Sequence, residues 1–280
     1  MPTIVVIGSV NLDLVATVDR LPAPGETVTG AELSRFPGGK GANQALAAQR
    51  LGADVKLVAC VGSDTAADEA LTLLRDGGVE LSDCQAVDDI PTGTALIAVA
   101  PSGENHIVVA PGANRRLAPD LLALPTGDAL ICQLEVPTDT VAKAVAEFDG
   151  FICVNLAPAM QIDVSVLQRA DLIVVNESEA AWYGESLSAC VGMIATTFGA
   201  AGAVLSRQGE DIARTKPPRV NAVDTTAAGD TFTAALTVAL VEGQEPEAAL
   251  QFACAAGAAA ATKLGAQPSL PTRDEVIALL

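Results

Sequence analysis

The stretch "NAVDTTAAGDTFTAALTVAL", residues 221–240, leads through a run of small residues into an apolar helix. Asp230 stands at the mouth of that predicted helix, where backbone N–H groups are unpaired and an acidic side chain commonly serves as the N-cap. A cap alone does not need Ala227, Ala228 and Gly229 before it. Small residues at such a turn let a ligand approach the backbone closely, and an anion is the natural ligand of a helix N-terminus. The stretch by itself therefore leaves two interpretations, a helix cap and an anion site.

Around this stretch, short runs rich in Val and Ile alternate with runs rich in Ala and Leu. The apolar runs predict buried strands at 3–8, 55–60, 129–134, 151–156, 171–176 and 202–206. The Ala- and Leu-rich runs predict helices at 42–52, 66–78, 139–148 and 230–243. Alternation of this kind predicts an α/β fold with a parallel sheet covered by helices on both faces.

Two segments break the alternation. Residues 12–36 alternate polar with apolar residues and carry turn residues at "PAPGE", and residues 92–110 resemble a hairpin around "PSGEN". Strands of this pattern expose one face, which suits an antiparallel appendage better than a buried central sheet. We therefore expect residues 1–280 to form a single α/β domain with a small β flap made from these two segments.

Composition excludes several classes of function. The chain has 16 basic and 34 acidic residues, a net charge of −18, which argues against nucleic acid and anionic membranes as partners. One histidine and six cysteines without a C-x-x-C pair make a zinc site improbable. Without a signal peptide or an apolar run of membrane length, the sequence predicts a reduced, cytoplasmic protein.

Polar side chains follow several of the predicted strands. Asn11 and Asp13 come just after the first strand, and Glu135 follows another. Ligands of open α/β sheets bind at this edge, and an amide and a carboxylate two residues apart can face the same way to bind vicinal hydroxyls of a sugar. An Asx turn is the alternative for Asn11 and Asp13. Asn176 and Glu179 follow a further strand, where they could organise hydrated Mg²⁺ and phosphate or form a capping box.

A glycine-rich stretch, "RFPGGKGANQALAAQRLG" (35–52), opens another helix. It is not a P-loop, because Gly41 follows Lys40 where Ser or Thr is required. A dinucleotide fingerprint is excluded as well, since the turn after the first strand holds one glycine. A plain strand-to-helix turn is the alternative to a binding loop.

Taken in order, "GSVNLD" (8–13), "GGKGANQALAAQRLG" (38–52), "PGAN" (111–114), "QLE" (133–135), "DTTAAGDTF" (224–232) and "KLGAQPSLP" (263–271) resemble the ribokinase family of sugar kinases, in the PfkB superfamily. The resemblance runs essentially end to end. It implies a ribokinase-like three-layer sandwich, with a central mostly parallel sheet, helices on both faces and a small antiparallel β lid. It also implies transfer of the γ-phosphate of ATP to the 5-hydroxyl of D-ribose.

The resemblance assigns roles to residues of this chain. Asp230 would be the general base that takes the proton of the sugar hydroxyl. The anion hole for the transferring phosphoryl group would be formed by the backbone N–H groups of Ala227, Ala228 and Gly229. The sugar would be bound by Asn11, Asp13, Gly39, Lys40, Asn43 and Glu135. The nucleotide and its phosphates would lie along Asn176, Thr197, Gly199, Gly202, Gly229 and Cys254.

Metal ions and a partner are also implied by the resemblance. Glu179, with Asn176, would organise Mg²⁺. A monovalent activator, usually K⁺, would be held near the anion hole by Asp224, Thr226, Ala260, Lys263, Gly265 and Ser269, several of them through carbonyl groups. The lid would close over the sugar and would also pair two subunits into a homodimer.

Three features depart from the family pattern. The segment between Asn176 and Thr197 is short, Ala200 and Ala201 replace polar residues near the nucleotide, and Cys254 stands where Asn or His is usual. Two other functions stay open: a kinase for another sugar or nucleoside, such as deoxyribose, fructose or pseudouridine, and a non-catalytic sugar sensor on the same fold.

Overall fold

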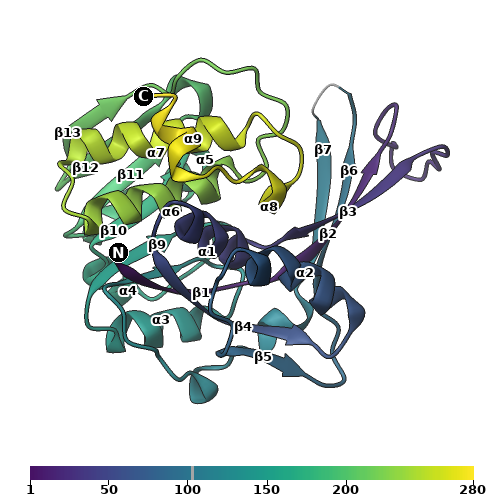
Figure 1. Cartoon of the computed structure of the whole chain (residues 1–280), viewed down its shortest axis with the longest axis horizontal. Coiled ribbons are helices and arrows are strands. Elements are labelled where there is room, and N and C mark those ends of the chain that lie inside the picture. Colours follow the sequence, from purple (N-terminus) through teal and green to yellow (C-terminus); the bar gives the residue numbers. More distant parts are fainter. Residues whose placement is uncertain (102–103) are drawn as a thin grey trace.

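The computed structural model describes residues 1–101 and 104–280, and its main body is built around one large sheet (Figure 1). This sheet has nine strands in the order β13 (Glu210–Thr215), β12 (Ala203–Arg207), β11 (Met193–Thr197), β10 (Leu172–Asn176), β9 (Phe151–Asn155), β8 (Ala129–Cys132), β1 (Thr3–Ile7), β4 (Asp54–Gly62) and β5 (Cys84–Val87). The pairs β11–β12 and β12–β13 are antiparallel, and the other pairs are parallel. The mostly parallel sheet expected from the sequence is confirmed.

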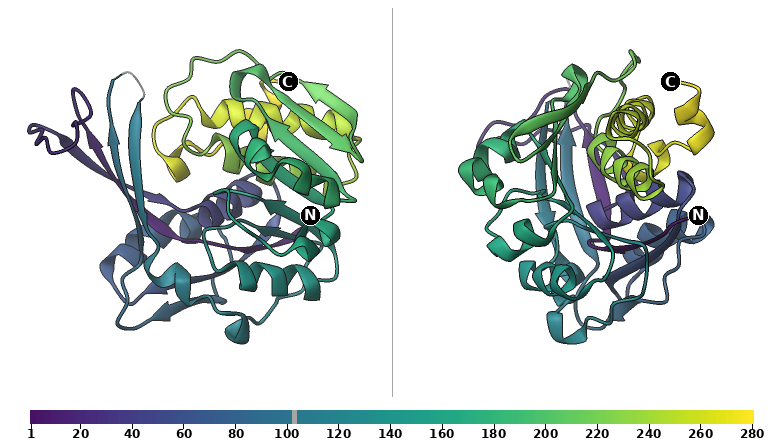
Figure 2. Two further views of the ribbon diagram at one scale, coloured as in Figure 1. Left: turned by 180° about the vertical axis from the view of Figure 1, so that it is seen from behind. Right: turned by 90° about the vertical axis from the view of Figure 1, so that its left-hand side faces the viewer.

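Helices cover both faces of the sheet, as the two views of Figure 2 show. One hydrophobic core joins the sheet to α1 (Lys40–Arg50), α2 (Thr65–Asp76), α6 (Ala228–Val241) and α7 (Pro246–Ala260). The other joins it to α3 (Thr138–Glu147), α4 (Val164–Arg169) and α5 (Glu177–Tyr183). Adjacent residues of β1 alternate between the cores: Val6 packs in the first and Val5 in the second. A strand buried on both faces therefore appears in the sequence as a continuous apolar run.

A second, smaller sheet projects from the body (Figures 1 and 2). Its strand order is β3 (Glu32–Gly38), β2 (Asn11–Thr17), β6 (Gly93–Val99) and β7 (Asn105–Ala110). The outer pairs β2–β3 and β6–β7 are antiparallel hairpins, whereas the inner strands β2 and β6 run parallel. Two hairpins from distant segments thus join side by side. Of the predicted turn "PSGEN", Ser102 and Gly103 lie outside the described residues.

The chain order places a switch point beside β1. From β1 the main sheet grows outward to β4 and β5, and the chain then returns to β8 on the other side of β1. Ligands of such sheets bind where the strand order reverses, outside the carboxyl ends of the strands. Residues 8–13 and 133–135 occupy this edge. The short helices α8 (Ala266–Ser269) and α9 (Arg273–Ile277) complete the chain.

None of the helices in the described part of the chain is both long enough and apolar enough to cross a membrane.

Candidate active site

Glu135 is the centre of the polar cluster at the switch point. Its Oε2 atom accepts hydrogen bonds from Ser9 Oγ at 2.5 Å, from the Lys40 backbone N–H at 3.2 Å and from Asn11 Nδ2 at 3.5 Å. The carboxylate therefore ties together the end of β1, the start of β2 and the start of α1. Since all three bonds end on one oxygen, the other remains as an acceptor for a ligand hydroxyl.

Asn11 and Asp13 both lie in β2 and face the same side of the lid sheet, because residues two apart in a strand share a face. The extended interpretation of this pair is thus confirmed over the Asx turn. A Cβ atom on Gly38 would lie 2.2 Å from Asp13 Oδ2, so only glycine leaves room for that carboxylate. Gly39 follows with a φ of 91°, a conformation that favours glycine and that starts α1 beside the carboxylates.

Asp230 lies buried in the first turn of α6. The N-cap of α6 is Ala227, which makes no side-chain cap bond, so the interpretation of Asp230 as a helix cap is wrong. Its carboxylate instead crosses to α1: Oδ2 accepts from Asn43 Nδ2 at 2.8 Å and Oδ1 from Gln44 Nε2 at 2.9 Å. Two neutral donors thus fix both oxygens of an acid that sits at a helix N-terminus.

Charges of opposite sign are concentrated at this site. Burial, together with the like charges of Glu135 and Asp230, raises the pKa of Asp13 to about 7, although Lys40 opposes the shift. Burial also raises the pKa of Asp230, against the lowering effects of Lys40, Asn43 and Gln44. Desolvation would lower the pKa of Lys40, but the surrounding carboxylates hold it above its ordinary value. A buried carboxylate with a raised pKa is suited to proton transfer near neutral pH.

A cavity of about 670 Å³ adjoins the start of α6. Its lining brings together the predicted nucleotide residues Asn176, Thr197, Gly199, Gly202, Gly229 and Cys254. Phe232, Gly257 and Ala258 add apolar groups to the lining, and burial raises the pKa of the Cys254 thiol to about 12, so this thiol is neutral. The cavity thus combines apolar side chains with the exposed backbone of Gly229 at the start of α6, which suits a base joined to an anionic tail.

The Asn176 and Glu179 side chains form a complete capping box on α5. Asn176 Oδ1 accepts from the Glu179 N–H and Glu179 Oε2 accepts from the Asn176 N–H, both at 2.8 Å. The capping interpretation is therefore confirmed. The other carboxylate oxygen of Glu179 takes no part in the cap. Hard oxygen donors of this kind fit a Mg²⁺ ion that keeps most of its waters.

The residues expected to hold a monovalent cation come from the loop before α6, from the end of α7 and the turn after it, and from the end of α8. Asp224 Oδ1 accepts from the Thr226 N–H at 2.9 Å and from its hydroxyl at 2.5 Å, and Asp224 Oδ2 accepts from the Gly265 N–H at 2.9 Å. The Ser269 hydroxyl bonds the Ala266 carbonyl at 2.8 Å, and Lys263 Nζ reaches Glu275. The donor set is made of oxygen atoms, which fits a hard cation.

The amide of Ala228 already has a partner. Its N–H donates to the Thr225 carbonyl at 3.2 Å, so an anion at this position competes with a bond of the turn. The exposed Gly229, which has open space around its Cα, is the more accessible member of the predicted anion hole.

Sequence reasoning missed four polar residues at this edge: Ser9, Gln44, Asn114 and Asn155. Asn114 accepts from the Val10 N–H at 2.9 Å and donates to Asn11 Oδ1 at 2.8 Å, so it orients the Asn11 amide. Asn114 and Ser9 belong to motifs quoted above, "PGAN" and "GSVNLD". The motifs therefore contained these two residues, but the neighbouring sequence does not show which hydrogen-bond partner each small polar side chain has.

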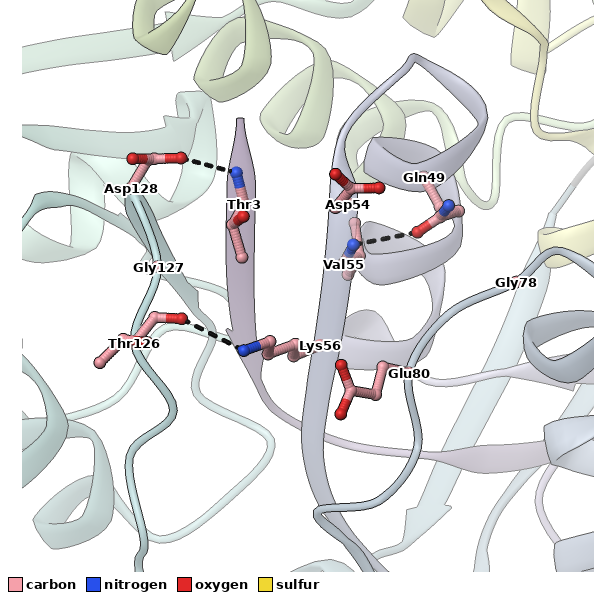
Figure 3. Close-up of a pocket in the computed structure, with 10 residues that line it drawn as sticks. All are labelled: Thr3, Gln49, Asp54, Val55, Lys56, Gly78, Glu80, Thr126, Gly127 and Asp128. Atoms are coloured by element: carbon pink, nitrogen blue, oxygen red, sulfur yellow. Dashed lines mark hydrogen bonds between the residues drawn. The ribbon is translucent and has the colours of Figure 1, made fainter. Parts of the chain in front are cut away.

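A second hollow of about 590 Å³ lies at the amino-terminal ends of β1, β4 and β8, opposite the site (Figure 3). Its polar groups are engaged in tying strand ends together: Asp128 accepts from the Thr3 N–H, and Lys56 Nζ donates to the Thr126 carbonyl. These two bonds hold strand ends together in the described structure.

Known proteins resemble this chain over its whole length. The pattern of pfkB family carbohydrate kinases matches residues 1–273. A ribokinase of Bacillus subtilis is 40% identical over 294 residues, which cover 100% of both chains. The crystal structure of a ribokinase from Thermotoga maritima matches with a TM-score of 0.91 at 35% identity, over 100% of this chain and 99% of the other. An Arabidopsis thaliana ribokinase in complex with ribose and ATP matches with a TM-score of 0.86 at 31% identity, over 99% and 98%.

Proposed function

The chain belongs to the pfkB family of carbohydrate kinases, and we propose that it is an ATP-dependent ribokinase. It transfers the γ-phosphate of ATP to the 5-hydroxyl of D-ribose. The observation that carries this proposal is the position of Asp230 between a hydroxyl-binding cluster and a nucleotide-sized cavity. The full-length similarity to a ribokinase that binds ribose and ATP supports both substrates.

In this proposal Asp230 takes the proton of the 5-hydroxyl while that oxygen attacks the γ-phosphorus of ATP. The bond from phosphorus to the bridging oxygen of ADP breaks, and ADP leaves. Asn11, Asp13, Gly39, Lys40, Asn43 and Glu135 hold the sugar. The amides of Ala227, Ala228 and Gly229 stabilise charge on the transferring group, and the nucleotide lies along Asn176, Thr197, Gly199, Gly202 and Cys254. Catalysis of this type rests mainly on positioning and charge stabilisation.

Two metal ions belong to the same proposal. Mg²⁺, which neutralises phosphate charge when bound, would be organised by Asn176 and Glu179. Potassium would be held by Asp224, Thr226, Ala260, Lys263, Gly265 and Ser269, beside the turn that carries the anion hole. The oxygen-rich donor sets and the bond that joins the loop before α6 to the turn after α7 support these assignments.

We also propose that residues 1–280 act as one kinase domain whose second sheet is the lid. The outer face of this sheet exposes apolar side chains, which supports pairing of two lids in a homodimer. Six free cysteines, most of them buried, support a reducing compartment, and we place the protein in the cytoplasm on that basis.

The first experiment is ADP release from ATP and Mg²⁺ across ribose, deoxyribose, fructose and simple nucleosides. Turnover selective for ribose is the expected result, and the rate should fall sharply when tetramethylammonium replaces potassium. Asp230→Asn should lose on the order of 10²–10⁴-fold in kcat while ribose and ATP binding persist.

Each alternative has its own outcome in the same assay. Turnover on another panel member would keep the chemistry and change the sugar. Ribose binding without turnover in the wild-type protein would indicate a sensor. A wild-type rate in Asp230→Asn would refute the base, and a rate independent of potassium would refute the cation site.

A further inference from the structure

Gln44 follows the sugar-binding Asn43 in α1 and is fully buried. Its Nε2 atom donates to Asp230 Oδ1 at 2.9 Å and to Asn155 Oδ1 at 3.1 Å. Asn155, at the end of β9, donates from Nδ2 to the Val174 carbonyl at 3.1 Å. A line of amide hydrogen bonds therefore runs from the backbone of β10 through two side chains to the proposed base.

The donor and acceptor atoms of these groups fix the orientation of each amide in this line of hydrogen bonds. A backbone carbonyl can only accept, so Asn155 must turn its NH₂ group toward Val174 and its oxygen toward Gln44. Gln44 must then present its own NH₂ group, which also serves Asp230. Rotating the Gln44 amide by half a turn would set oxygen against oxygen at both contacts.

The same arrangement has a cost in stability. Among the described residues Gln44 Oε1 is buried without a hydrogen-bond partner, although buried polar atoms are normally paired. Asn43, which donates to the other oxygen of Asp230, has an equally unpaired Oδ1. Two adjacent amides thus leave their acceptors unsatisfied while both donors meet one carboxylate, a pattern that serves the carboxylate and not the stability of α1.

We propose that Gln44 is a positioning residue for the base Asp230, held in its donating orientation by Asn155. The inference rests on the proposed function in so far as Asp230 is the base. Gln44 fixes one carboxylate oxygen and Asn43 the other, so the plane of the acid is set before the sugar arrives. Donors to a carboxylate also favour its ionised form, which is the form that accepts the sugar proton.

Other charged groups act on the same carboxylate and are present in every variant discussed below. Lys40 on α1 favours its ionised form. Glu135, after β8, disfavours that form, as do Asp13 on β2 and Glu179 on α5, which carry charge of the same sign. Without the Gln44 donor, burial and the neighbouring like charges should therefore raise the pKa of Asp230 further.

The test compares Gln44→Met, which keeps the length but removes the amide, with Gln49→Met near the other end of α1. Gln49 accepts from the Val55 N–H and lies away from the site, so it controls for loss of a hydrogen-bonded amide from this helix. The carboxyl group of Asp230 is titrated by ¹³C NMR in protein labelled at aspartate, with Asp230→Asn giving the assignment. In Gln44→Met the pKa of Asp230 should rise by about one pH unit, and in Gln49→Met it should stay at the wild-type value.

Kinetics supply the second readout. At saturating ribose and ATP, kcat of Gln44→Met should fall on the order of tenfold at neutral pH and recover toward the wild-type value at alkaline pH, with KM for ribose within about twofold. Gln44→Glu, an isosteric second variant, should shift the acid limb of kcat further, because two adjacent carboxyl groups share a proton.

The outcomes separate this inference from the proposed function. An unchanged Asp230 titration in both Gln44 variants would overturn the positioning role, as would a loss of kcat that is equal at every pH. A shifted titration in a protein that does not phosphorylate ribose would refute the function and keep the positioning of Asp230.

Discussion

At the scale of residues, the cluster that we propose binds the sugar holds the carboxylates of Asp13, Glu135 and Asp230 around the ammonium group of Lys40. Such a site is unfavourable without its ligand, because buried like charges repel and have lost water. The donors around Glu135 and Asp230 offset part of this cost. In our proposal, these residues are therefore arranged to bind the sugar at the expense of the stability of the ligand-free protein.

The first prediction concerns Asp13 and the stability of the ligand-free protein. Its folded pKa is about 7 and its ordinary value 3.8, so between these pH values the folded state holds a proton that the unfolded state has released. The free energy of unfolding should therefore decline as pH rises from about 4 toward about 7. The Asp13→Asn variant should lack this contribution to the decline. Its free energy of unfolding should exceed that of the wild type by an amount that grows with pH, to at most about 4 kcal/mol at pH 8.

Denaturant unfolding at pH 5 and pH 8 measures this effect. Asp19→Asn, at an exposed carboxylate just beyond the same strand, is the matched control and should show no such growth. A gain that is equal at both pH values, or a loss at pH 8, would contradict the charge explanation.

At the scale of elements, two helices among the described residues begin with a complete capping box. Asn176 and Glu179 cap α5 at the site, and Thr272 and Glu275 cap α9 away from it. In both places a Glu follows the capping residue by three positions, which is the sequence signature of such a box. The same local device therefore caps a helix in both places and, in our proposal, also organises Mg²⁺ in one of them.

Substitution by glutamine separates helix capping by Glu179 from its proposed role in binding Mg²⁺. In Glu179→Gln the amide oxygen can still accept from the Asn176 N–H, so stability should change by less than about 1 kcal/mol. The lost charge should lower activity at limiting Mg²⁺ on the order of 10–100-fold. Glu275→Gln, which changes the second box and its ion pair with Lys263, should change stability as little and should leave the Mg²⁺ dependence of the rate as in the wild type. Titration of the rate with Mg²⁺ in both variants checks this, and equal behaviour of the pair would refute the metal role of Glu179.

At the scale of the whole molecule, the lid sheet has two distinct faces. Asp13 points to the inner face, and strand pairing puts Leu33, Leu96 and Val108 on the outer one, where they are 67%, 50% and 63% exposed. Large exposed side chains grouped on one sheet favour contact with another protein surface. In our proposal the partner is a second copy of the same lid, since a two-fold interface uses one patch twice.

The third prediction follows from this face. The double variant Leu96→Glu with Val108→Glu should be monomeric, because charges buried across a two-fold axis repel their own copies. Sedimentation velocity over a range of protein concentrations measures the change. Val164→Glu, at a residue 53% exposed on α4, is the control and should leave the assembly as in the wild type. A monomeric wild-type protein at micromolar concentration would refute the dimer.

The sequence by itself determined the α/β class, the order of most buried strands and the edge at which polar residues gather. These features are local: a strand buried on both faces must be apolar along its length, and its polar successors fall at its end. The edge strands β5 and β13 were missed, because their exposed residues break the apolar run on which the prediction depends.

Which hydrogen bonds those polar residues form with one another was decided only by the tertiary structure. Whether Asp230 caps α6 or crosses to Asn43 and Gln44 depends on the packing of α1 against α6, nearly two hundred positions apart in the chain. The parallel pairing of β2 with β6 and the hydrogen bond from Asn114 to Asn11 likewise join distant segments. Hydrogen bonds act over about 3 Å, so partners that the fold brings together leave no signal in either local sequence.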